Sequence, residues 1–424
     1  MASKLVSSLS WLSAVVLLLV PAASSAAATR GGTNPFFFDR RSFAYTAKTS
    51  HGSFKALHAF SGRTQLRGGA TDSYRLGLLR AAPRTFVLPS HWDADELLYV
   101  LKGRGVITQV PRGREGGDTQ EISEGDVLWV PAGTMVYLLN ADAKESLRVA
   151  VLLRTISSPT GDYMEFFAAG GLEPESFLRA FSSELQEAAF NSRREELERI
   201  LGRQQKGAFV KVTEEQIRAL LSHREGGQSG TRSPFPLLSQ KPSYSNDRGQ
   251  MHEVTAREYP QLRRLDVVVS LANITAGSME APSYNSKATR IALVISGEGY
   301  VEMVRRRRRE EAAEEGGARY EKVRSEVSAG EVFVIPAGQP VVTVAASGGE
   351  GLQVLCFGLQ AEENRRIFLA GENGVLKELE RETKELSFGA PRKEVDEVLN
   401  AQKRSIFVEG PQQASRRGAE SRLS

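Results

Sequence analysis

The chain has 424 residues, of which 41% are hydrophobic and 25% charged, with 55 basic and 51 acidic side chains and a formal net charge of +4. This composition is that of a folded globular protein; it excludes an intrinsically disordered chain, and the small net charge argues against a dedicated nucleic-acid binder. A single cysteine excludes an intrachain disulfide framework, and five histidines limit how many histidine-based metal sites the chain could hold.

Residues 1–28 have the pattern of an export signal. Lys4 supplies a positive start, an apolar run covers residues 11–20, and small residues follow up to Ala28. The run is about half the ~20 residues that a membrane-spanning helix needs, so a membrane anchor is the weaker alternative. The sequence predicts cleavage near Ala28, entry into the secretory pathway, and no membrane partner for the mature chain.

Two halves of the remaining chain repeat one another. The motif Gly125–Gly133 (GDVLWVPAG) returns 205 residues later as Gly330–Gly338 (GEVFVIPAG), and each copy follows an apolar run that ends in a Gly-x-Gly turn. Each half begins with short apolar strands bounded by turn residues and continues with helical patterns. Matched blocks in the same order predict a mainly β fold with two similar domains, residues 34–222 and 251–411, each with a helical arm.

The helical arms follow the strands in each half. Two capping boxes, Ser192-x-x-Glu195 and Thr213-x-x-Gln216, predict helix starts in the first arm, and helices are predicted over residues 367–386 and 394–403 in the second. Each arm has an apolar stripe beside a strand set that closes on itself. We therefore expect a partner subunit to cover it, with folding back onto the same domain as the alternative.

Segments without a periodic pattern separate and follow the halves. Residues 223–250 are rich in Gly, Ser and Pro and predict a linker, whereas residues 412–424 predict a flexible tail.

The second half carries three local features of its own. Asn273-Ile274-Thr275 is a permitted sequon, so the sequence predicts N-glycosylation at Asn273 of an exported chain. The run Arg305–Arg309 lies in an interval that is longer than its counterpart, which predicts a solvated hairpin insertion open to trypsin-like cleavage. Contact of this run with an anionic membrane or nucleic acid is the alternative. Cys356 stands in an apolar run and predicts a buried strand thiol.

The repeated motif has the form G-x5-P-x-G, which resembles the second motif of the cupin superfamily; two copies make a bicupin. Further blocks extend the resemblance from Asn34 to Pro411, and together they are similar to the vicilins, the 7S seed storage globulins. These blocks are NPFFF (34–38), PSHWDAD (89–95), EAAFN (187–191), NSKAT (285–289), FLAG (368–371) and KELSF (384–388).

The resemblance implies a mainly β fold of two jelly-roll β-barrels, each followed by a helical arm. It also implies a homotrimer formed through the arms and deposition in the protein storage vacuole as a nitrogen and amino-acid reserve.

Metal-dependent cupins place three His and one Glu inside each barrel, and this chain lacks most of them. In the first half, His91 and Glu96 fall at two of the four positions, but Pro89 and Val136 stand at the others. Two ligands are too few to fix a transition metal without other groups. We therefore interpret His91 and Glu96 as a buried polar pair, with a remnant site for a weakly held ion as the alternative. In the second half the four positions hold Ser283, Asn285, Arg290 and Val341.

The sequence thus predicts a storage protein with no catalytic activity, no cofactor and no nucleic-acid partner. The basic residues comprise 41 Arg and 14 Lys, and the three side-chain nitrogens of Arg suit a nitrogen reserve. Two alternatives stay open: a vicilin relative that binds a sugar or another small molecule in a barrel, and a metal-dependent bicupin enzyme such as an oxalate-degrading one.

Overall fold

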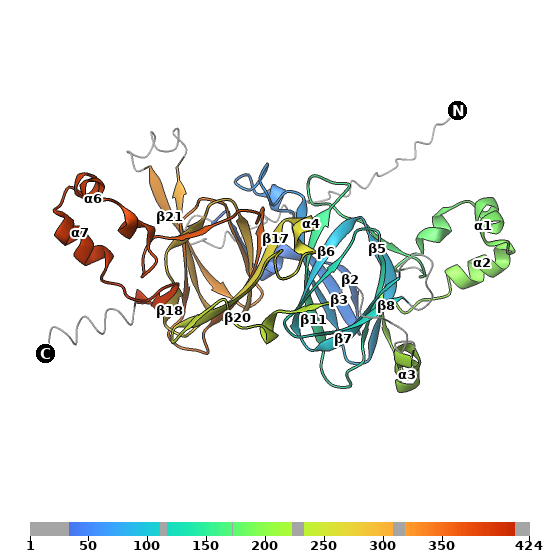
Figure 1. Cartoon of the computed structure of the whole chain (residues 1–424). Helices are drawn as coiled ribbons and strands as arrows, with labels where there is room; N and C mark the ends of the chain where they lie inside the picture. The colour runs from blue at the N-terminus through green and yellow to red at the C-terminus, as the bar shows by residue number, and fades with distance from the viewer. Residues whose placement is uncertain (1–33, 111–116, 172, 223–232, 308–318, 412–424) are drawn as a thin grey trace, which may run out of the picture. The chain divides into compact units, whose positions relative to one another are not determined.

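A computed structural model of the chain describes residues 34–110, 117–171, 173–222, 233–307 and 319–411 (Figure 1). The described residues fold mainly as antiparallel strands in three sheets. The predicted export signal and C-terminal tail lie outside the described residues. No helix within the described ranges is both long and apolar enough to cross a membrane.

Two sheets of the first half enclose one apolar core. One sheet has the order β14-β9-β6-β11-β4-β3-β2, where β14 is Phe235–Pro236, and the other has the order β12-β5-β10-β7-β8 with β13 added on β5. The bounds are β2 Phe43–Thr49, β3 Gly52–Leu57, β4 Tyr74–Ala81, β5 Thr85–Trp92, β6 Ala94–Lys102, β7 Arg104–Val110, β8 Asp118–Ser123, β9 Asp126–Val130, β10 Met135–Asn140, β11 Leu147–Thr155, β12 Glu165–Phe167 and β13 Phe209–Lys211.

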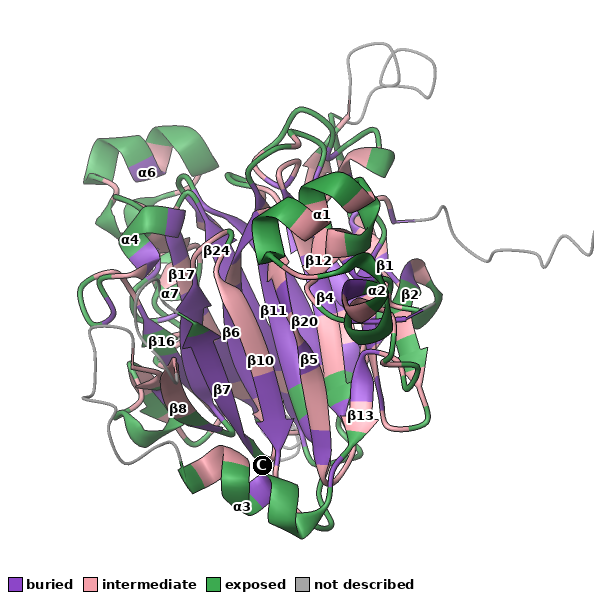
Figure 2. Ribbon diagram, turned by 90° about the vertical axis from the view of Figure 1, so that its right-hand side faces the viewer, coloured by how far each residue is buried: buried purple, intermediate pink, exposed green. Residues whose placement is uncertain are grey.

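Alternation along these strands separates two apolar layers. In β6, Leu98 and Val100 belong to the core between the two sheets, whereas Leu97 and Tyr99 belong to a second cluster that includes residues of the other half. This follows from the period of two along a strand, because both faces of β6 are covered. Figure 2 shows the resulting burial, with β6, β7 and β11 largely purple and the helix α1 (Ser183–Phe190) largely green.

The second half forms one large sheet that repeats the same strand pattern. Its main path runs β15-β16-β17-β24-β20-β23-β18-β26, and β19, β21, β22 and β25 pair off this path. The bounds are β15 Tyr244–Asn246, β16 Gly249–Val254, β17 Val267–Ile274, β18 Ser278–Glu280, β19 Ser283–Asn285, β20 Thr289–Arg306, β21 Tyr320–Ser328, β22 Val332–Ile335, β23 Val341–Ala345, β24 Leu352–Leu359, β25 Arg366–Phe368 and β26 Phe407–Glu409.

Each half contributes its leading strand to the other half. Strand β1 (Phe37–Phe38) pairs with β22, and β14 (Phe235–Pro236) pairs with β9. Phe38 is buried, and its ring packs edge-on against Phe60 with centroids 5.5 Å apart. The predicted limits 34–222 and 251–411 therefore differ from the pairing in the structure, because a strand at the start of each half completes the neighbouring sheet.

The repeated motif has the same backbone in both halves. Gly125 and Gly330 have φ values of +88° and +87°, and Gly133 and Gly338 have +72° and +75°. These left-handed conformations favour glycine, which explains why the motif holds Gly at both ends in each copy. The predicted repeat is confirmed at the level of local geometry.

Paired short helices form an arm in each half, as Figure 1 shows for α1 with α2 and for α6 with α7. Each arm begins with a 3-10 turn, and after each arm the chain returns to its sheet through β13 or β26. The bounds are η3 Phe177–Ala180, α1 Ser183–Phe190, α2 Arg194–Leu201 and α3 Glu214–Ser222 in the first half, and η6 Val375–Glu378, α6 Arg381–Phe388 and α7 Arg392–Leu399 in the second. The remaining turns are η1 Arg40–Ser42, η2 Phe60–Gly62, η5 Leu237–Ser239 and the short helix α4 Leu262–Leu265.

One of the two predicted capping boxes is present. Thr213 Oγ1 accepts from the backbone N–H of Gln216 at 3.2 Å, and Gln216 Oε1 accepts from the N–H of Thr213 at 3.0 Å. The box predicted at Ser192 is wrong, because α2 is capped at Arg193 without a side-chain bond and Ser192 Oγ donates instead to the carbonyl of Phe190. The chain already turns at Asn191, whose left-handed backbone ends α1.

Three further expectations differ from the structure. The helix predicted over 367–386 is divided into β25, η6 and α6, because Gly371 and Gly374 interrupt it. Residues 223–232 of the predicted linker 223–250 lie outside the described residues, whereas its later part contains β14, η5 and β15 rather than an unstructured linker.

The arginine run begins inside the β20–β21 hairpin rather than in a loop. Glu321 on β21 forms ion pairs with Arg305 and with Arg307, the latter at 3.1 Å. Arg308 and Arg309 lie outside the described residues.

Candidate functional site

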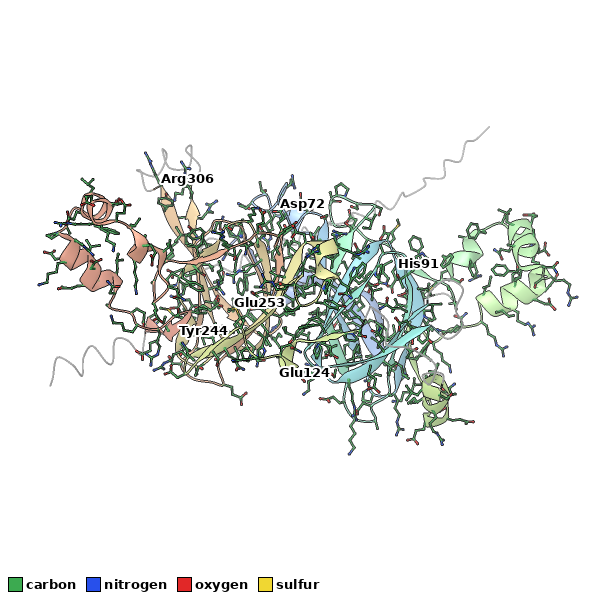
Figure 3. The ribbon with its side chains drawn as sticks, in the orientation of Figure 1. Asp72, His91, Glu124, Tyr244, Glu253 and Arg306 are labelled. Atoms are coloured by element: carbon green, nitrogen blue, oxygen red, sulfur yellow. The ribbon has the colours of Figure 1, made fainter. Side chains whose placement is uncertain are left out.

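His91 lies on the outer face of β5, away from the barrel core. Its ring stacks on Phe166 of β12 with centroids 5.0 Å apart and meets the edge of Phe177 at 5.5 Å (His91 is labelled in Figure 3). The neighbours on either side, Ser90 and Trp92, are buried, and Trp92 belongs to the core. The structure therefore does not bring His91 and Glu96 together, and the interpretation of these residues as a polar pair is corrected.

His91 faces outward because β5 is offset by one residue from the alignment that the sequence motif suggests, in which His91 would match Asn285. The N–H of Gly133 bonds to the carbonyl of Trp92, and the N–H of the equivalent Gly338 bonds to the carbonyl of Asn285, each at 2.8 Å. Trp92 is therefore the counterpart of Asn285, and Ser90 is the counterpart of Ser283. Because side chains alternate along a strand, this shift by one residue moves His91 out of the barrel.

Glu96 faces the barrel interior, but its neighbour is another acid. It shares the inward face of β6 with Leu98, while Glu165 on β12 accepts a bond from Ser90 Oγ at 2.9 Å. Burial raises the pKa of Glu96 to about 8, and the charges of Glu165 and Asp95 add to this effect. Burial raises the pKa of Glu165 to about 7, against hydrogen bonds from Ser90 and Trp92.

The other two motif positions of the first barrel do not supply metal ligands. Pro89 has no donor atom in its side chain, and Val136 is apolar. Asn140, four residues after Val136 and outside the four ligand positions, is fully buried and donates from Nδ2 to the carbonyls of Ala81, Ala82 and Glu145 at 2.9–3.1 Å. Asn140 therefore has a structural role, since it joins the backbone at Ala81 and Ala82 to that at Glu145. Across the described ranges, no three or more His, Cys, Asp or Glu side chains gather as a metal site would require.

The second barrel carries arginines where the first carries acids. Arg290 on β20 lies opposite Ile335 and Gly358, just as Glu96 lies opposite Val130 and Leu153 at the matching places of the repeat. Arg366 on β25 lies opposite Asn285 on β19, just as Glu165 on β12 lies opposite Trp92 on β5. The two barrels therefore have opposite charge at the same two positions.

Arg366 forms one hydrogen bond and one ion pair with its neighbours, and its Nη2 has no hydrogen-bond partner among the described residues. Its Nε donates to Ser283 Oγ at 3.2 Å, and its Nη2 lies 3.1 Å from Glu280 Oε2. Burial on its own would raise the pKa of Glu280, but the charges of Arg366 and Arg290 bring this pKa below its ordinary value. Glu280 is therefore the anionic partner of this cluster.

Arg290 is also buried, and it has fewer hydrogen-bond partners than Arg366. Only 7% of it is exposed, and its Nε and Nη2 have no hydrogen-bond partner among the described residues. Asn285 is 4% exposed, and its Nδ2 also has no partner there. Burial lowers the pKa of Arg290, and the charge of Arg366 lowers it further.

A cavity of about 620 Å³ lies beside these groups. Its walls include Arg290, Asn285, Arg366 and Glu253, which is labelled in Figure 3. Burial raises the pKa of Glu253, although Arg366 and Arg290 oppose the rise.

Cys356, predicted as a buried strand thiol, is buried on β24, and burial raises its pKa to about 11.

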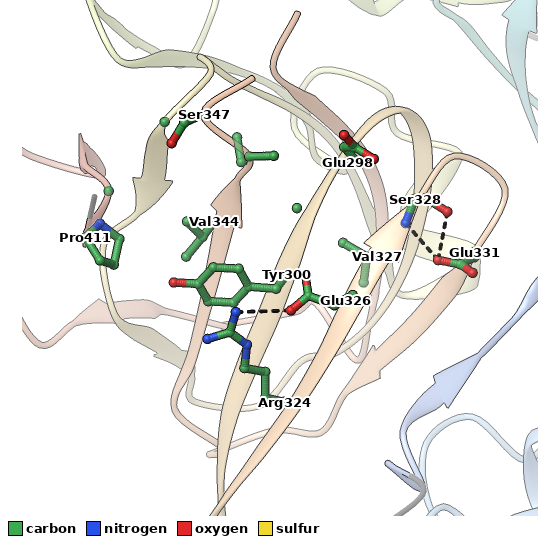
Figure 4. Close-up of a pocket in the computed structure, with 15 residues that line it drawn as sticks. Glu298, Tyr300, Arg324, Glu326, Val327, Ser328, Glu331, Val344, Ser347 and Pro411 are labelled. Atoms are coloured by element: carbon green, nitrogen blue, oxygen red, sulfur yellow. Dashed lines mark hydrogen bonds and ion pairs between the residues drawn. The ribbon is translucent and has the colours of Figure 1, made fainter. Parts of the chain in front are cut away.

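A second cavity, of about 680 Å³, lies on the outer side of the β20–β21 hairpin (Figure 4). Arg324 lies over the ring of Tyr300 at 3.6 Å, and its Nη2 donates to Glu326 at 3.0 Å. Glu331 accepts from the N–H and Oγ of Ser328. Arg324 and Glu331 already have partners within the chain, whereas Arg290 has buried donors without partners among the described residues. The Arg290 cavity is therefore the stronger candidate for a ligand site.

Sequence reasoning identified Glu96 and Arg290 by their motif positions but missed Glu165 and Arg366. Both missed residues open a three-residue strand of similar sequence, EFF in the first half and RIF in the second. Comparison of these two short strands could have found them.

Comparison with known proteins agrees with the fold. Residues 76–197 and 235–396 match the Cupin family. Vicilin Cor a 11.0101 from Corylus avellana is 41% identical over 393 residues, which cover 91% of this chain and 85% of the relative. The vicilin-like antimicrobial peptides 2-2 from Macadamia integrifolia are 42% identical, but this chain spans only 60% of that relative's length while the match covers 92% of this chain.

A crystal structure of vicilin from Solanum melongena, reported with different anionic ligands in structurally similar pockets, superposes with a TM-score of 0.82. It is 36% identical, and the superposition covers 89% of this chain and 99% of that one. With two cupin matches and this agreement in sequence and fold, the chain belongs to the vicilin family of seed storage globulins.

Proposed function

We propose that the chain is a reserve of nitrogen and amino acids without catalytic activity, held in the protein storage vacuole. The observation that carries this proposal is the chemistry of the four inward positions of each barrel. They hold Ser90, Trp92, Glu96 and Val136 in the first barrel and Ser283, Asn285, Arg290 and Val341 in the second. Neither set resembles the three His and one Glu that a metal-dependent cupin needs, and a buried cation such as Arg290 repels a metal ion.

Tissue abundance and elemental analysis test this proposal together. A reserve should accumulate to a high level in maturing seed and disappear during germination. Purified protein should contain manganese and iron far below one atom per chain. Low constitutive expression, or near-stoichiometric metal with oxalate-degrading activity, would overturn the proposal.

We propose that the helical arms join three copies of the chain. Phe190 and Phe388, which occupy equivalent places in the two arms, are 48% and 47% exposed, and the equivalent Ile200 and Val398 are 65% and 75% exposed. Matched exposed apolar groups at both ends of one chain suit head-to-tail contacts that close into a ring.

We also propose the predicted route of the chain through the secretory pathway, with cleavage near Ala28 and a glycan on Asn273. Asn273 is half-buried on β17 between Gln250 and Gln353, and it lines a surface cavity of about 460 Å³. N-terminal sequencing and the mass change on glycosidase treatment test both points; an unprocessed start or an unchanged mass would overturn them.

A second candidate function is the binding of small anions in the C-terminal barrel. It is supported by the buried Arg290 donors beside the 620 Å³ cavity and by the anionic ligands reported for the Solanum melongena relative. Calorimetric titration with acetate and sulfate tests it, with sucrose as the probe for the sugar alternative. Heat from sucrose alone would favour that alternative.

A further inference from the structure

We infer that the first half of the chain binds a small polyanion of the oligophosphate class on the outer surface of its seven-stranded sheet. The site consists of four exposed cations on neighbouring strands, which we call the cation row: Lys48, Arg80, Arg148 and Lys102. It lies outside both barrel interiors, and it does not depend on the anion binding proposed for the second barrel.

Strand pairing places the members of the cation row side by side. Arg148 on β11 lies opposite Arg80 on β4 and opposite Lys102 on β6. On the other side of Arg80, Ser53 on β3 lies between Arg80 and Lys48 on β2. Opposite residues of antiparallel strands have Cβ atoms about 4.5–5.5 Å apart. Four cations therefore occupy five neighbouring strands, of which β2, β3, β6 and β11 are labelled in Figure 1.

The cation row faces outward, at the margin of an apolar layer. Phe54 and Val149, each one residue along its strand from a residue of the row's face, belong to the core between the two sheets. Side chains alternate along a strand, so the row is on the opposite face. On that face, Leu78 and Ala150 belong to the apolar layer shared with the second half. The row begins where this layer ends.

Only one acid within the chain pairs with the cation row. Lys102 Nζ lies 3.5 Å from Glu145 Oε1. Arg80 Nη2 donates at 3.2 Å to the hydroxyl of Ser146, which carries no charge. The end of the row at Lys102 is thus partly neutralised, whereas the charge of Arg80 is not.

The remaining two cations have no acidic partner among the described residues. Lys48 Nζ lies over the ring of Tyr45, 4.6 Å from its centroid. Arg148, in the middle of the row, forms no side-chain hydrogen bond or ion pair with a residue that the structure describes. Like charges directly opposite each other on neighbouring strands destabilise a sheet. A bound polyanion would replace this repulsion with attraction.

The second half of the chain has no cations at the same places. Asn273 stands one residue from the partner of Gly249, just as Arg80 stands one residue from the partner of Gly52. The equivalent row consists of neutral polar residues, namely Gln250, Asn273, Gln353 and Ser296. The repeated sheet therefore forms without cations in this row, which favours a binding role for the charge in the first half.

The residue types and their spacing determine the class of ligand. Arg80 and Arg148 offer two adjacent guanidinium groups, and each group can pair two N–H donors with two oxygens of a phosphate. Lys102 and Lys48 lie on either side of them as point charges, which suit further phosphate groups of the same molecule. A monocarboxylate can contact only one or two of these cations, whereas an oligophosphate can contact the whole row.

A compact molecule suits the cation row better than an anionic membrane or a nucleic acid does. Glu145 and Asp142 lie in the turn beside the row, where they pair with Lys102 and with Arg104 at 3.5 and 3.4 Å. These two acids would repel an extended anionic surface. A small polyanion can bind along the row without approaching them.

Calorimetric titration of the full-length protein with tripolyphosphate at low ionic strength tests the inference. We expect one molecule per chain, with an affinity at least about tenfold higher than that of orthophosphate, because only the longer anion contacts the whole row. The affinity should fall as salt is added, since the cations are exposed to solvent. Excess acetate at matched ionic strength should not compete, because it cannot contact the whole row.

Variants separate the cation row from the general charge of the protein. R80Q/R148Q should lower the affinity for tripolyphosphate at least about tenfold, because it removes both guanidinium groups. Both side chains are exposed, so the melting temperature without ligand should stay close to that of the parent. R218Q/R365Q removes two exposed arginines elsewhere and is the charge-matched control, which should bind like the parent.

Three outcomes would overturn the inference. Equal affinity for orthophosphate and tripolyphosphate would exclude a ligand that contacts the whole row. Unchanged binding by R80Q/R148Q, or equal losses in this variant and in R218Q/R365Q, would exclude the row as the site. Sedimentation with phosphatidylserine vesicles, without heat from tripolyphosphate, would assign the row to a membrane instead.

Discussion

Glu96 and Arg290 occupy the same position in the two halves of the chain, each on the strand that leads into the Gly-x-Gly turn and each facing its own barrel interior. The same reversal of charge occurs at Glu165 and Arg366. A duplicated fold thus contains one acidic and one basic interior. This contrast gives the two halves different responses to pH and to ligands.

The acidic interior should make stability depend on pH. Since burial raises the pKa of Glu96 to about 8 and of Glu165 to about 7, the folded state holds protons that the unfolded state has already lost above about pH 4.5. The contribution of these groups to the free energy of unfolding therefore falls as pH rises from about 4.5 to 8, and then levels off.

The substitution E96Q replaces the titrating carboxyl group of Glu96 with an uncharged amide, so the contribution of this residue to stability no longer depends on pH. We expect its melting temperature to match the parent at pH 5 and to exceed it by a few degrees, roughly 2–5 °C, at pH 8. Scanning calorimetry across this range measures the difference between the two proteins. A constant difference at all pH values would contradict the prediction.

The N-terminal capping box should stabilise α3 measurably. T213A removes the bond from Thr213 Oγ1 to the N–H of Gln216 and should cost about 1 kcal/mol. S192A is the matched control, because Ser192 caps no helix and should cost less than about 0.5 kcal/mol. Chemical denaturation of both variants gives the two values, and equal losses would argue against the cap.

The exchanged strand β1 should be important to overall stability. Phe38 is 2% exposed and packs on Phe60, so F38A leaves a cavity and should cost about 3–5 kcal/mol. Y45A, at a site that is 56% exposed, should change the free energy of unfolding by about 1 kcal/mol or less. A small loss in F38A would mean that β1 contributes little to the sheet it completes.

Charges placed on the arms should disrupt association. The double variant I200E/V398E should convert the proposed trimer into monomers without lowering the melting temperature of the barrels, because both side chains are exposed within one chain. Light scattering after size-exclusion chromatography measures the mass. Y45E, away from the arms, should remain trimeric; dissociation of both variants alike would point to a different contact surface.

The sequence predicted the parts of the fold that depend on repeated local patterns. The matched glycines reproduce the same left-handed turns at Gly125 and Gly330, and the reciprocal pattern at Thr213 and Gln216 caps a helix as expected. Both depend on contacts within a few residues. The box at Ser192 failed because Asn191 and Arg193 provide the local geometry instead.

The candidate site depended on distant pairing, which the linear pattern did not reveal. His91 and Trp92 are adjacent in sequence, and only the bond from Gly133 to Trp92 determines which of them faces the core. Glu165, whose charge acts on Glu96, lies on β12, which follows Glu96 by 69 residues and belongs to no motif. Long-range register, rather than composition, determined which residues meet.

The reciprocal placement of β1 and β14 has a consequence for how such a protein can be cut. If a protease opens the chain between the halves, each fragment still holds a strand of the other's sheet, at Phe37 against Phe333 and at Phe235 against Val127. A nicked molecule would then keep the mass and shape of the intact one under native conditions. Cleavage of the chain and separation of its fragments are thus two separate events. The second requires β1 and β14 to dissociate from the sheets of the other half.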